Sequence, residues 1–154
     1  MAKKLMAGIS TKERVIVIVA LLVFVIDRIT KMLAKEYLGQ GKIVDLLLFK
    51  FRYSTNTGGA FSILKDHSLL LTILGIIAFF ALVYLLRKSS DKPMMTLAKG
   101  LIFGGAAGNL LDRIFVRHVI DFIDVGFWPI FNVADMALTI GVMLVLLYLI
   151  KKRQ

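Results

Sequence analysis

The sequence contains no cysteine and only ten acidic residues against twenty lysines and arginines, in a chain of 154 residues. Without cysteine, the chain has no disulfide framework, no thiol nucleophile and no thiolate metal site, and redox chemistry gives no indication of its compartment. Charged residues make up only 19% of the chain, whereas a typical soluble domain has about 25%. An ordinary water-soluble globular fold is therefore disfavoured.

Hydrophobic residues are abundant instead, at 58% of the chain, and the mean hydropathy is +0.82. This excludes a disordered basic tail, because such segments are poor in apolar residues. The net charge of +10 would suit nucleic-acid binding if it lay on one polar face, but long apolar runs interrupt it. We therefore expect an integral membrane protein with no nucleic-acid partner.

Four segments are long and apolar enough to cross about 30 Å of hydrocarbon as helices. They are residues 13–34, 68–86, 96–112 and 133–150, with approximate bounds. The first begins with the apolar run Val15–Ile26, preceded by lysines, as in a secretory signal peptide. Because Asp27 and Arg28 follow at once and no small-x-small cleavage site is present, we expect an uncleaved span.

The basic residues predict the orientation of these spans. With both termini on the cytoplasmic side, that side holds eleven cations and two acids, a net charge of +9. The opposite side holds nine cations and eight acids, a net charge of +1. This distribution follows the positive-inside rule, so most of the charge is a topology signal.

Residues 38–65, between the first two spans, form the only outer segment long enough to fold. Phe49–Ser54 alternates with period two, as a half-buried strand does. Asn56–Gly59 predicts a turn, and Ala60–Leu64 a returning strand. We therefore predict an all-α membrane protein, a single domain over residues 1–154, with a four-transmembrane-helix bundle and a small extracytoplasmic β-sheet between its first two helices.

Polar residues near the spans are costly and usually have a reason, and here they gather at one membrane depth on the outer side. This set comprises Asp27, Lys31, Asn109, Asp112, Arg113, Asp121, Asp124, Asn132 and Asp135. Structural interpretations exist for two pairs. Asp27 and Lys31 can neutralise each other at i,i+4, and Asn132 with Asp135 can form a capping box.

Other residues near this depth also have a structural interpretation. Asp112 and Arg113 can mark the interfacial end of the third span, and Asp124 is expected to be a solvated loop acid. His118 has no second ligand near it, so we expect no metal site there. Gly100, Gly104 and Gly108 recur every four residues, which predicts close helix packing in lipid.

The motifs of other enzyme classes are absent from the sequence. It has no plausibly spaced Ser/His/Asp set, no HExxH and no phosphate-binding glycine loop before a lysine. Two carboxylates in a low-dielectric site share a proton, so one can act as base and the other as acid. Asp121 and Asp135 are the best such pair, because the chain between them can leave and return to the same depth.

Five sequence blocks then carry a resemblance to a known family. They are Asp27-x-x-x-Lys31, Asn56-Thr57-Gly58-Gly59-Ala60-Phe61-Ser62, Gly104–Arg113, Val119-Ile120-Asp121-Phe122 and Phe131-Asn132-Val133-Ala134-Asp135. In this order, and with four spans, the chain resembles the lipoprotein signal peptidases (signal peptidase II) over nearly its whole length. The resemblance implies a bacterial inner-membrane aspartic protease.

The resemblance also implies roles for individual residues. The catalytic pair would be Asp121 and Asp135. Asn56, Asn109, Arg113 and Asn132 would bind substrate, and Asp27, Lys31, Asp112 and Gly58 would support the site. The enzyme would use no metal or cofactor.

The implied reaction is removal of the signal peptide from diacylglyceryl-modified prolipoproteins, on the N-terminal side of the lipidated cysteine. By the same resemblance, the protein would be a monomer surrounded by phospholipid in the cytoplasmic membrane. Both termini would be cytoplasmic and the active site would lie near the outer leaflet.

The sequence departs from the family pattern at two places. Arg117 stands where a glycine is common, and Gly59 where alanine is common. The Asp121–Asp135 stretch, which contains Trp128 and Pro129, is also short. Two alternative functions are a transporter or channel subunit that couples protons through Asp27 or Asp135, and a purely structural membrane subunit. A carrier would place its carboxylate near the midplane, and a structural subunit leaves the polar cluster unexplained.

Overall fold

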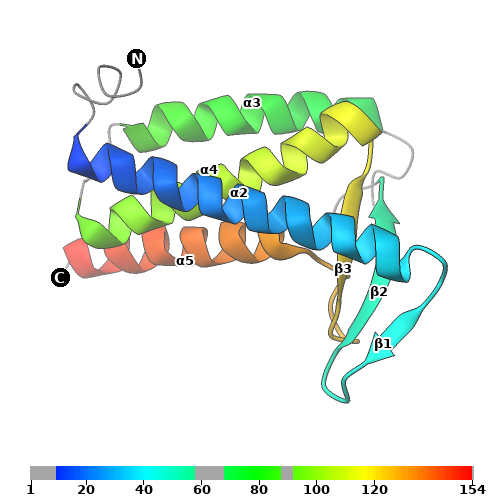
Figure 1. Ribbon diagram of the computed structural model, residues 1–154. Coiled ribbons are helices and arrows are strands. Elements are labelled where there is room, and N and C mark those ends of the chain that lie inside the picture. Colours follow the sequence, from blue (N-terminus) through cyan, green and yellow to red (C-terminus); the bar gives the residue numbers. More distant parts are fainter. Residues whose placement is uncertain (1–9, 58–67, 88–91, 154) are drawn as a thin grey trace.

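The computed structural model describes residues 10–57, 68–87 and 92–153. Four helices lie side by side, and a three-stranded sheet stands at one end of them (Figure 1). In chain order the elements are α2 (Thr11–Leu38), β1 (Ile43–Asp45), β2 (Lys50–Asn56), α3 (Ser68–Arg87), α4 (Pro93–Val116), β3 (Val119–Asp124) and α5 (Val133–Arg153). α2 begins and α5 ends at the end of the bundle away from the sheet.

Three helices in the described part of the chain are long and apolar enough to cross a membrane: α3 over Leu69–Leu86, α4 and α5. The α3 stretch has a mean hydropathy of 2.8, and all of its side chains except that of Leu86 are exposed or half-buried. A water-soluble protein does not expose so large an apolar surface, so this is a multi-pass membrane protein. The predicted spans at 68–86, 96–112 and 133–150 coincide with these helices.

α2 occupies the position of the first predicted span and is continuous over 28 residues. Ser10 and Glu13 start it with a capping box, in which the Ser10 amide donates to Glu13 Oε2 and the Glu13 amide donates to Ser10 Oγ. Its second half carries Asp27, Arg28 and Lys31. Because of these charges α2 is not one of the three apolar helices, and its crossing of the membrane stays a prediction.

α4 is the central helix and packs against α2, α3 and α5. A Cβ atom added at Gly100 would lie 2.6 Å from the Val19 side chain, and one at Gly104 would lie 2.6 Å from the Ala20 carbonyl oxygen, both on α2. On another side of α4, a Cβ at Gly105 would lie 2.5 Å from the Ala134 carbonyl oxygen of α5. The predicted close packing through small residues is therefore confirmed.

Gly104→Ala is expected to lower the free energy of unfolding by about 1–3 kcal/mol, because the new methyl group meets helix backbone that cannot rotate away. Gly75→Ala in α3 is the matched control, since its Cβ would lie 3.5 Å from the Leu110 side chain, an ordinary contact. Alanine there should be neutral or stabilising by up to about 1 kcal/mol. Unfolding in detergent measures both, and equal destabilisation would contradict the packing argument.

The sheet has the order β1-β2-β3, with both neighbouring pairs antiparallel. β1 and β2 come from the predicted outer segment, and β2 matches the period-two strand. The predicted location of the sheet was wrong in one respect: its third strand is β3, which lies between α4 and α5. Asn56, the first residue of the turn predicted at 56–59, ends β2 instead, while residues 58–59 and the returning strand at 60–64 lie outside the described residues.

β3 was missed because it lacks the alternation of a half-buried strand. Its residues are buried except Ile123, which is half-buried, so apolar side chains occur on both faces of the strand. Phe122 packs with Ala34 and Leu38 near the end of α2. This small core anchors the sheet on α2, beside the point where α4 ends and α5 begins.

Arg117 ends α4 in the left-handed region, with φ 61°. Glycine adopts this conformation without the steric cost that a side chain adds. Although Arg117 stands where a glycine was expected, the turn that leads into β3 therefore keeps the backbone conformation that glycine favours.

Candidate active site

A cavity of about 150 Å³ lies where the sheet meets the ends of α4 and α5. The polar residues that line it are Asn56, Asn109, Arg113, Asp121 and Asp135. Its apolar wall comprises Val119 and Trp128–Phe131. Five of the six predicted catalytic and substrate-binding residues therefore line one cavity, and the sixth, Asn132, lies directly behind it with no exposed surface.

Asp121 is presented by β3 and is held by two asparagines. The register of the sheet pairs Asp121 with Ser54, so the end of β2 brings Asn56 close to it. Asn56 Nδ2 donates to Asp121 Oδ2 at 3.0 Å, and Asn132 Nδ2 donates to Asp121 Oδ1 at 2.7 Å. Both carboxylate oxygens are thus oriented by amides.

Asp135 lies in the first turn of α5 and forms a reciprocal pair of hydrogen bonds with Asn132. The Asp135 amide donates to Asn132 Oδ1 at 2.9 Å, and the Asn132 amide donates to Asp135 Oδ2 at 3.2 Å. Asn109 Nδ2 donates to the other oxygen, Oδ1, at 2.7 Å. The predicted capping box is therefore confirmed, and it holds the same carboxylate that faces the cavity.

Asn109 and Asn132 connect the two aspartates. Lys31 Nζ donates to Asn109 Oδ1 at 2.9 Å, and Asn132 Nδ2 lies 3.1 Å from the same oxygen. Because this oxygen faces two donors, the amide nitrogen of Asn109 must point the other way, toward Asp135. Lys31 thereby sets the orientation of a side chain that contacts the aspartate.

Burial raises the pKa of the Asp121 carboxyl to about 7, because its charged form is poorly solvated there. The negative charge of nearby Asp135 also raises this pKa, whereas the hydrogen bonds from Asn56 and Asn132 lower it. Asp121 therefore keeps its proton below about pH 7, and a coupled pair of this kind holds one proton between two carboxyls.

Arg113 reaches the cavity from the last turn of α4. Within the described part of the chain, its guanidinium forms no hydrogen bond or ion pair, although Asp121 and Asp135 are near enough to act on it electrostatically. Its donors are thus available to a bound molecule. This placement fits the substrate-binding role predicted for Arg113.

Four charged side chains form a buried network behind the cavity. Lys31 Nζ lies 2.9 Å from Asp27 Oδ2 and 2.8 Å from Asp112 Oδ2. Arg28 bridges the same acids, with Nη2 at 2.9 Å from Asp27 Oδ2 and Nη1 at 2.6 Å from Asp112 Oδ1. Two cations balance two acids, which offsets the cost of placing charges in a low-dielectric region.

The same network holds the two backbone segments that carry the aspartates. Asp27 Oδ1 accepts from the Ala134 amide at 3.1 Å, and Asp112 Oδ2 accepts from the Ile120 amide at 3.4 Å. Ala134 precedes Asp135, and Ile120 precedes Asp121. The supporting role predicted for Asp27, Lys31 and Asp112 thus has a physical basis in these contacts.

Two members of the site region were misjudged or missed from the sequence. Asp124 is not a solvated loop acid: it belongs to β3, and its Oδ2 lies 2.7 Å from Arg52 Nε. Arg28 was not singled out, although it contacts both acids of the network. Its position next to Asp27 was the available signal. Gly58, predicted to support the site, lies outside the described residues.

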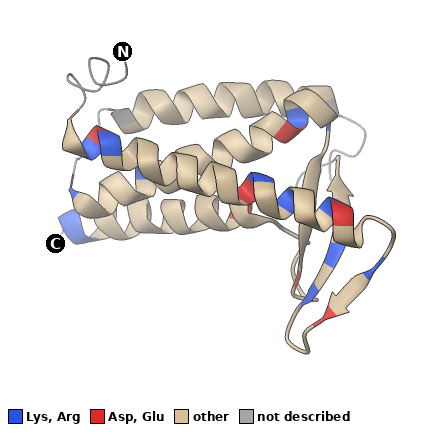
Figure 2. Ribbon diagram, in the orientation of Figure 1, with Lys and Arg blue, Asp and Glu red and all other residues tan. Residues whose placement is uncertain are grey.

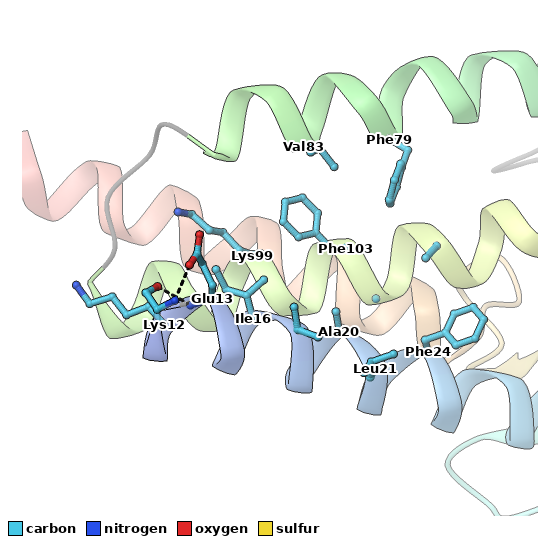
Figure 3. A pocket seen from close by; sticks show the side chains of 14 residues that line it. Lys12, Glu13, Ile16, Ala20, Leu21, Phe24, Phe79, Val83, Lys99 and Phe103 are labelled. Atoms are coloured by element: carbon cyan, nitrogen blue, oxygen red, sulfur yellow. Dashed lines mark hydrogen bonds between the residues drawn. The ribbon is translucent and has the colours of Figure 1, made fainter. Parts of the chain in front are cut away.

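A larger cavity of about 710 Å³ lies elsewhere, between α2, α3 and α4 (Figure 3). Ile16, Ala20, Phe24, Phe79 and Phe103 are among its apolar lining residues, and its charged lining residues are Lys12, Glu13 and Lys99. Neither Asp121 nor Asp135 lines it. Its chemistry suits an apolar occupant and not hydrolysis.

A family model described as signal peptidase (SPase) II matches residues 19–151. The chain belongs to the signal peptidase II family. The predicted resemblance is thereby confirmed, and the protein is a peptidase.

Individual members of the signal peptidase II family match over most of their length. A lipoprotein signal peptidase of Halothermothrix orenii is 37% identical over 134 residues, which cover 86% of this chain and 92% of that protein. One of Syntrophomonas wolfei subsp. wolfei is 40% identical over 138 residues, covering 87% and 93%. A solved structure described as a bacterial membrane enzyme aligns with a TM-score of 0.82 at 34% identity, covering 90% of this chain and 89% of that one.

Proposed function

We propose that this protein is an aspartic endopeptidase that removes signal peptides from diacylglyceryl-modified prolipoproteins, cutting on the N-terminal side of the lipidated cysteine. The observation that carries the proposal is that Asp121 and Asp135 line one small cavity and are bound by the same asparagine, Asn132. The proposed substrate follows from the family relatives, which are named lipoprotein signal peptidases.

In the proposed mechanism, the two aspartates divide the acid and base roles. Asp121, whose pKa is raised to about 7, donates its proton to the oxygen of the scissile carbonyl. Asp135, which accepts hydrogen bonds from Asn109 and Asn132 in the first turn of α5, acts as the base and takes a proton from the attacking water.

The hydroxyl oxygen of the water then bonds to the carbonyl carbon, giving a neutral tetrahedral diol. Collapse of the diol breaks the C–N bond. Asp135 gives its proton to the leaving amine, and Asp121 regains a proton from a diol hydroxyl. Both residues end in their starting protonation states, so the cycle needs no cofactor or metal.

Arg113 and the asparagines are proposed to bind the peptide around the scissile bond. The guanidinium of Arg113 offers donors to backbone carbonyls of an extended chain. Asn56 and Asn109 line the cavity beside the aspartates, so each can hold both a carboxylate and a peptide group.

The lipid chains of the substrate need an apolar path to this cavity. The large cavity between α2, α3 and α4 reaches Phe24 and Ala107 at one end. Ala107 precedes Gly108 and Asn109 on α4, so this apolar space approaches the site from within the membrane. We propose that the substrate reaches the aspartates from the bilayer side.

The proposed location is the bacterial cytoplasmic membrane. There α2 would cross the membrane in addition to α3, α4 and α5, and the protein would act as a monomer surrounded by phospholipids. The start of α2 and the end of α5 lie at one end of the bundle, where lysines and arginines gather (Figure 2). The positive-inside rule favours placing that end in the cytoplasm. The aspartates then lie near the outer leaflet.

Cleavage of matched substrates tests this function. Purified protein is incubated with a prolipoprotein carrying the diacylglyceryl group and with the same precursor lacking it. We expect cleavage of the lipidated form alone, N-terminal to its modified cysteine. Equal cleavage of both forms, or cleavage of neither, would reject the proposed specificity.

The pH dependence follows from the raised pKa of Asp121. Below about pH 7 Asp121 holds the proton that it must donate, and above that pH Asp121 loses this proton. kcat/KM should therefore fall as pH rises through about 7, approaching tenfold per pH unit.

Asn56→Leu sharpens this prediction. It removes a hydrogen bond that lowers the pKa of Asp121, so the fall in kcat/KM should move to higher pH. Thr55→Ala, at the neighbouring exposed position of β2, is the control and should leave the profile in place. A profile that is unchanged in Asn56→Leu would contradict the assignment of this titration to Asp121.

A further inference from the structure

A second polar feature lies at the end of the bundle away from the aspartates. A cavity of about 380 Å³ opens there between the start of α4 and the end of α5. Its lining residues are Lys92, Pro93, Met94, Tyr148, Lys151 and Lys152. Figure 2 shows the basic end of α5 at this side of the molecule, remote from the sheet.

The described residues that line this cavity carry charge of one sign. Lys92, directly before α4, and Lys151 and Lys152 on α5 line it, and none of the described residues that line it is acidic. Lys92 Nζ lies 5.8 Å from the centre of the Tyr148 ring, a cation–π contact that holds this lysine beside the cavity. α4 also has no acid in its first turn, so the partial positive charge of its N-terminus is not offset there.

The cavity also lies at the level of a membrane surface. The exposed apolar side chains of α5 continue to Ile150, and the basic residues begin at Lys151. Tyrosine and lysine together are typical of the boundary between hydrocarbon and headgroups. Tyr148 is fixed at this level because its ring packs against the cluster of Leu86, Met95 and Ile102.

We propose that this cavity binds the headgroup of an anionic phospholipid, with the phosphate among Lys92, Lys151 and Lys152. Basic pockets between helices at the cytoplasmic surface are suited to such headgroups. A phospholipid is favoured over a soluble anion because Pro93, Met94 and the Tyr148 ring give the cavity an apolar wall that continues into the lipid-exposed surface of α5. The bound lipid would connect α4 to α5, the helices that carry Asn109 and Asp135.

Binding of a short-chain phosphatidylglycerol to the full chain in uncharged detergent tests this site, with native mass spectrometry as the readout. Short-chain phosphatidylcholine and inorganic phosphate are the comparison probes. We expect phosphatidylglycerol to bind in preference to both. The double variant Lys92→Gln/Lys152→Gln should bind it about tenfold or more weakly.

The matched control is Arg14→Gln/Arg153→Gln, which removes two exposed charges near the same end without altering a lining residue. It should bind phosphatidylglycerol as the unmodified protein does. If the two double variants lose phosphatidylglycerol binding equally, the proposed site is overturned, because diffuse electrostatic attraction to this end of the protein then explains the binding. Equal binding of phosphatidylcholine would remove the anionic preference, and equal binding of inorganic phosphate would reject a lipid ligand. Because no measurement uses cleavage, these outcomes are separate from those that test the proposed protease.

Discussion

Asp121→Asn and Asp135→Asn are each expected to reduce cleavage of a lipidated prolipoprotein by about a thousandfold or more. Asparagine keeps the shape of the side chain but can neither donate a carboxylic proton nor accept one from water. Each variant should still fold, because neither aspartate belongs to the buried network of Asp27, Arg28, Lys31 and Asp112. Single-turnover cleavage and thermal unfolding in detergent measure the two properties separately.

Asp124→Asn is the matched control for this experiment. Asp124 lies on the same strand as Asp121 and undergoes the same chemical change, but its carboxylate pairs with Arg52 and does not line the cavity. Cleavage by Asp124→Asn should stay close to that of the unmodified protein. Normal processing by either Asp121→Asn or Asp135→Asn would eliminate the two-aspartate mechanism, whatever the control does.

Lys31→Met is expected to lower the free energy of unfolding by about 3–5 kcal/mol, because it leaves two buried acids with too little positive charge. Lys31 is 1% exposed and contacts Asp27, Asp112 and Asn109. The variant should also lose most activity, since the amide of Asn109 is no longer held in the orientation that reaches Asp135. Unfolding by denaturant in detergent and cleavage of the lipidated substrate are the measurements.

Lys50→Met is the control for the loss of an ion pair as such. Its pair with Asp45 has a similar distance, 2.7 Å, but both side chains are about half exposed, where solvent screens the attraction. We expect little change in stability. If Lys31→Met does not yield folded protein, Arg28→Met reports the same network from its half-buried side. If Lys31→Met and Arg28→Met each lose no more stability than Lys50→Met does, the proposed role of the network is contradicted.

The positions of the helices were predictable because they depend on local properties of the chain. Long apolar runs must be satisfied by helices in lipid, so α3, α4 and α5 coincide with their predicted segments. The depth of a polar residue in the membrane was also predictable, because its position along a helix determines its distance from the membrane surface. Asn109 and Asp135 were therefore grouped, and Asp121 with them because it lies in the short connection between their two helices.

β3 and Arg28 were not predictable in the same way. A strand buried on both faces has no alternation to reveal it, and its pairing with β2 depends on residues more than sixty positions away. Asp124 looked solvated because its partner Arg52 lies on β2. Arg28 acquires its function only when α4 brings Asp112 alongside α2.

The amino-acid sequence alone indicated a basic membrane protein whose few acids gather at one end, together with the aspartates, asparagines and arginine of its site. The membrane assignment and the gathering of polar residues need only composition, periodicity and the cost of placing charge in hydrocarbon. The roles of the asparagines and of Arg113 came from the resemblance to the family. Which side chain touches which depends on the folded chain, because rotation of each helix and the register of the sheet are set by packing between distant segments. The close approach of α4 to α2 through Gly104 and the pairing of β3 with β2 bring Lys31, Asn109, Asn132 and both aspartates into one connected site.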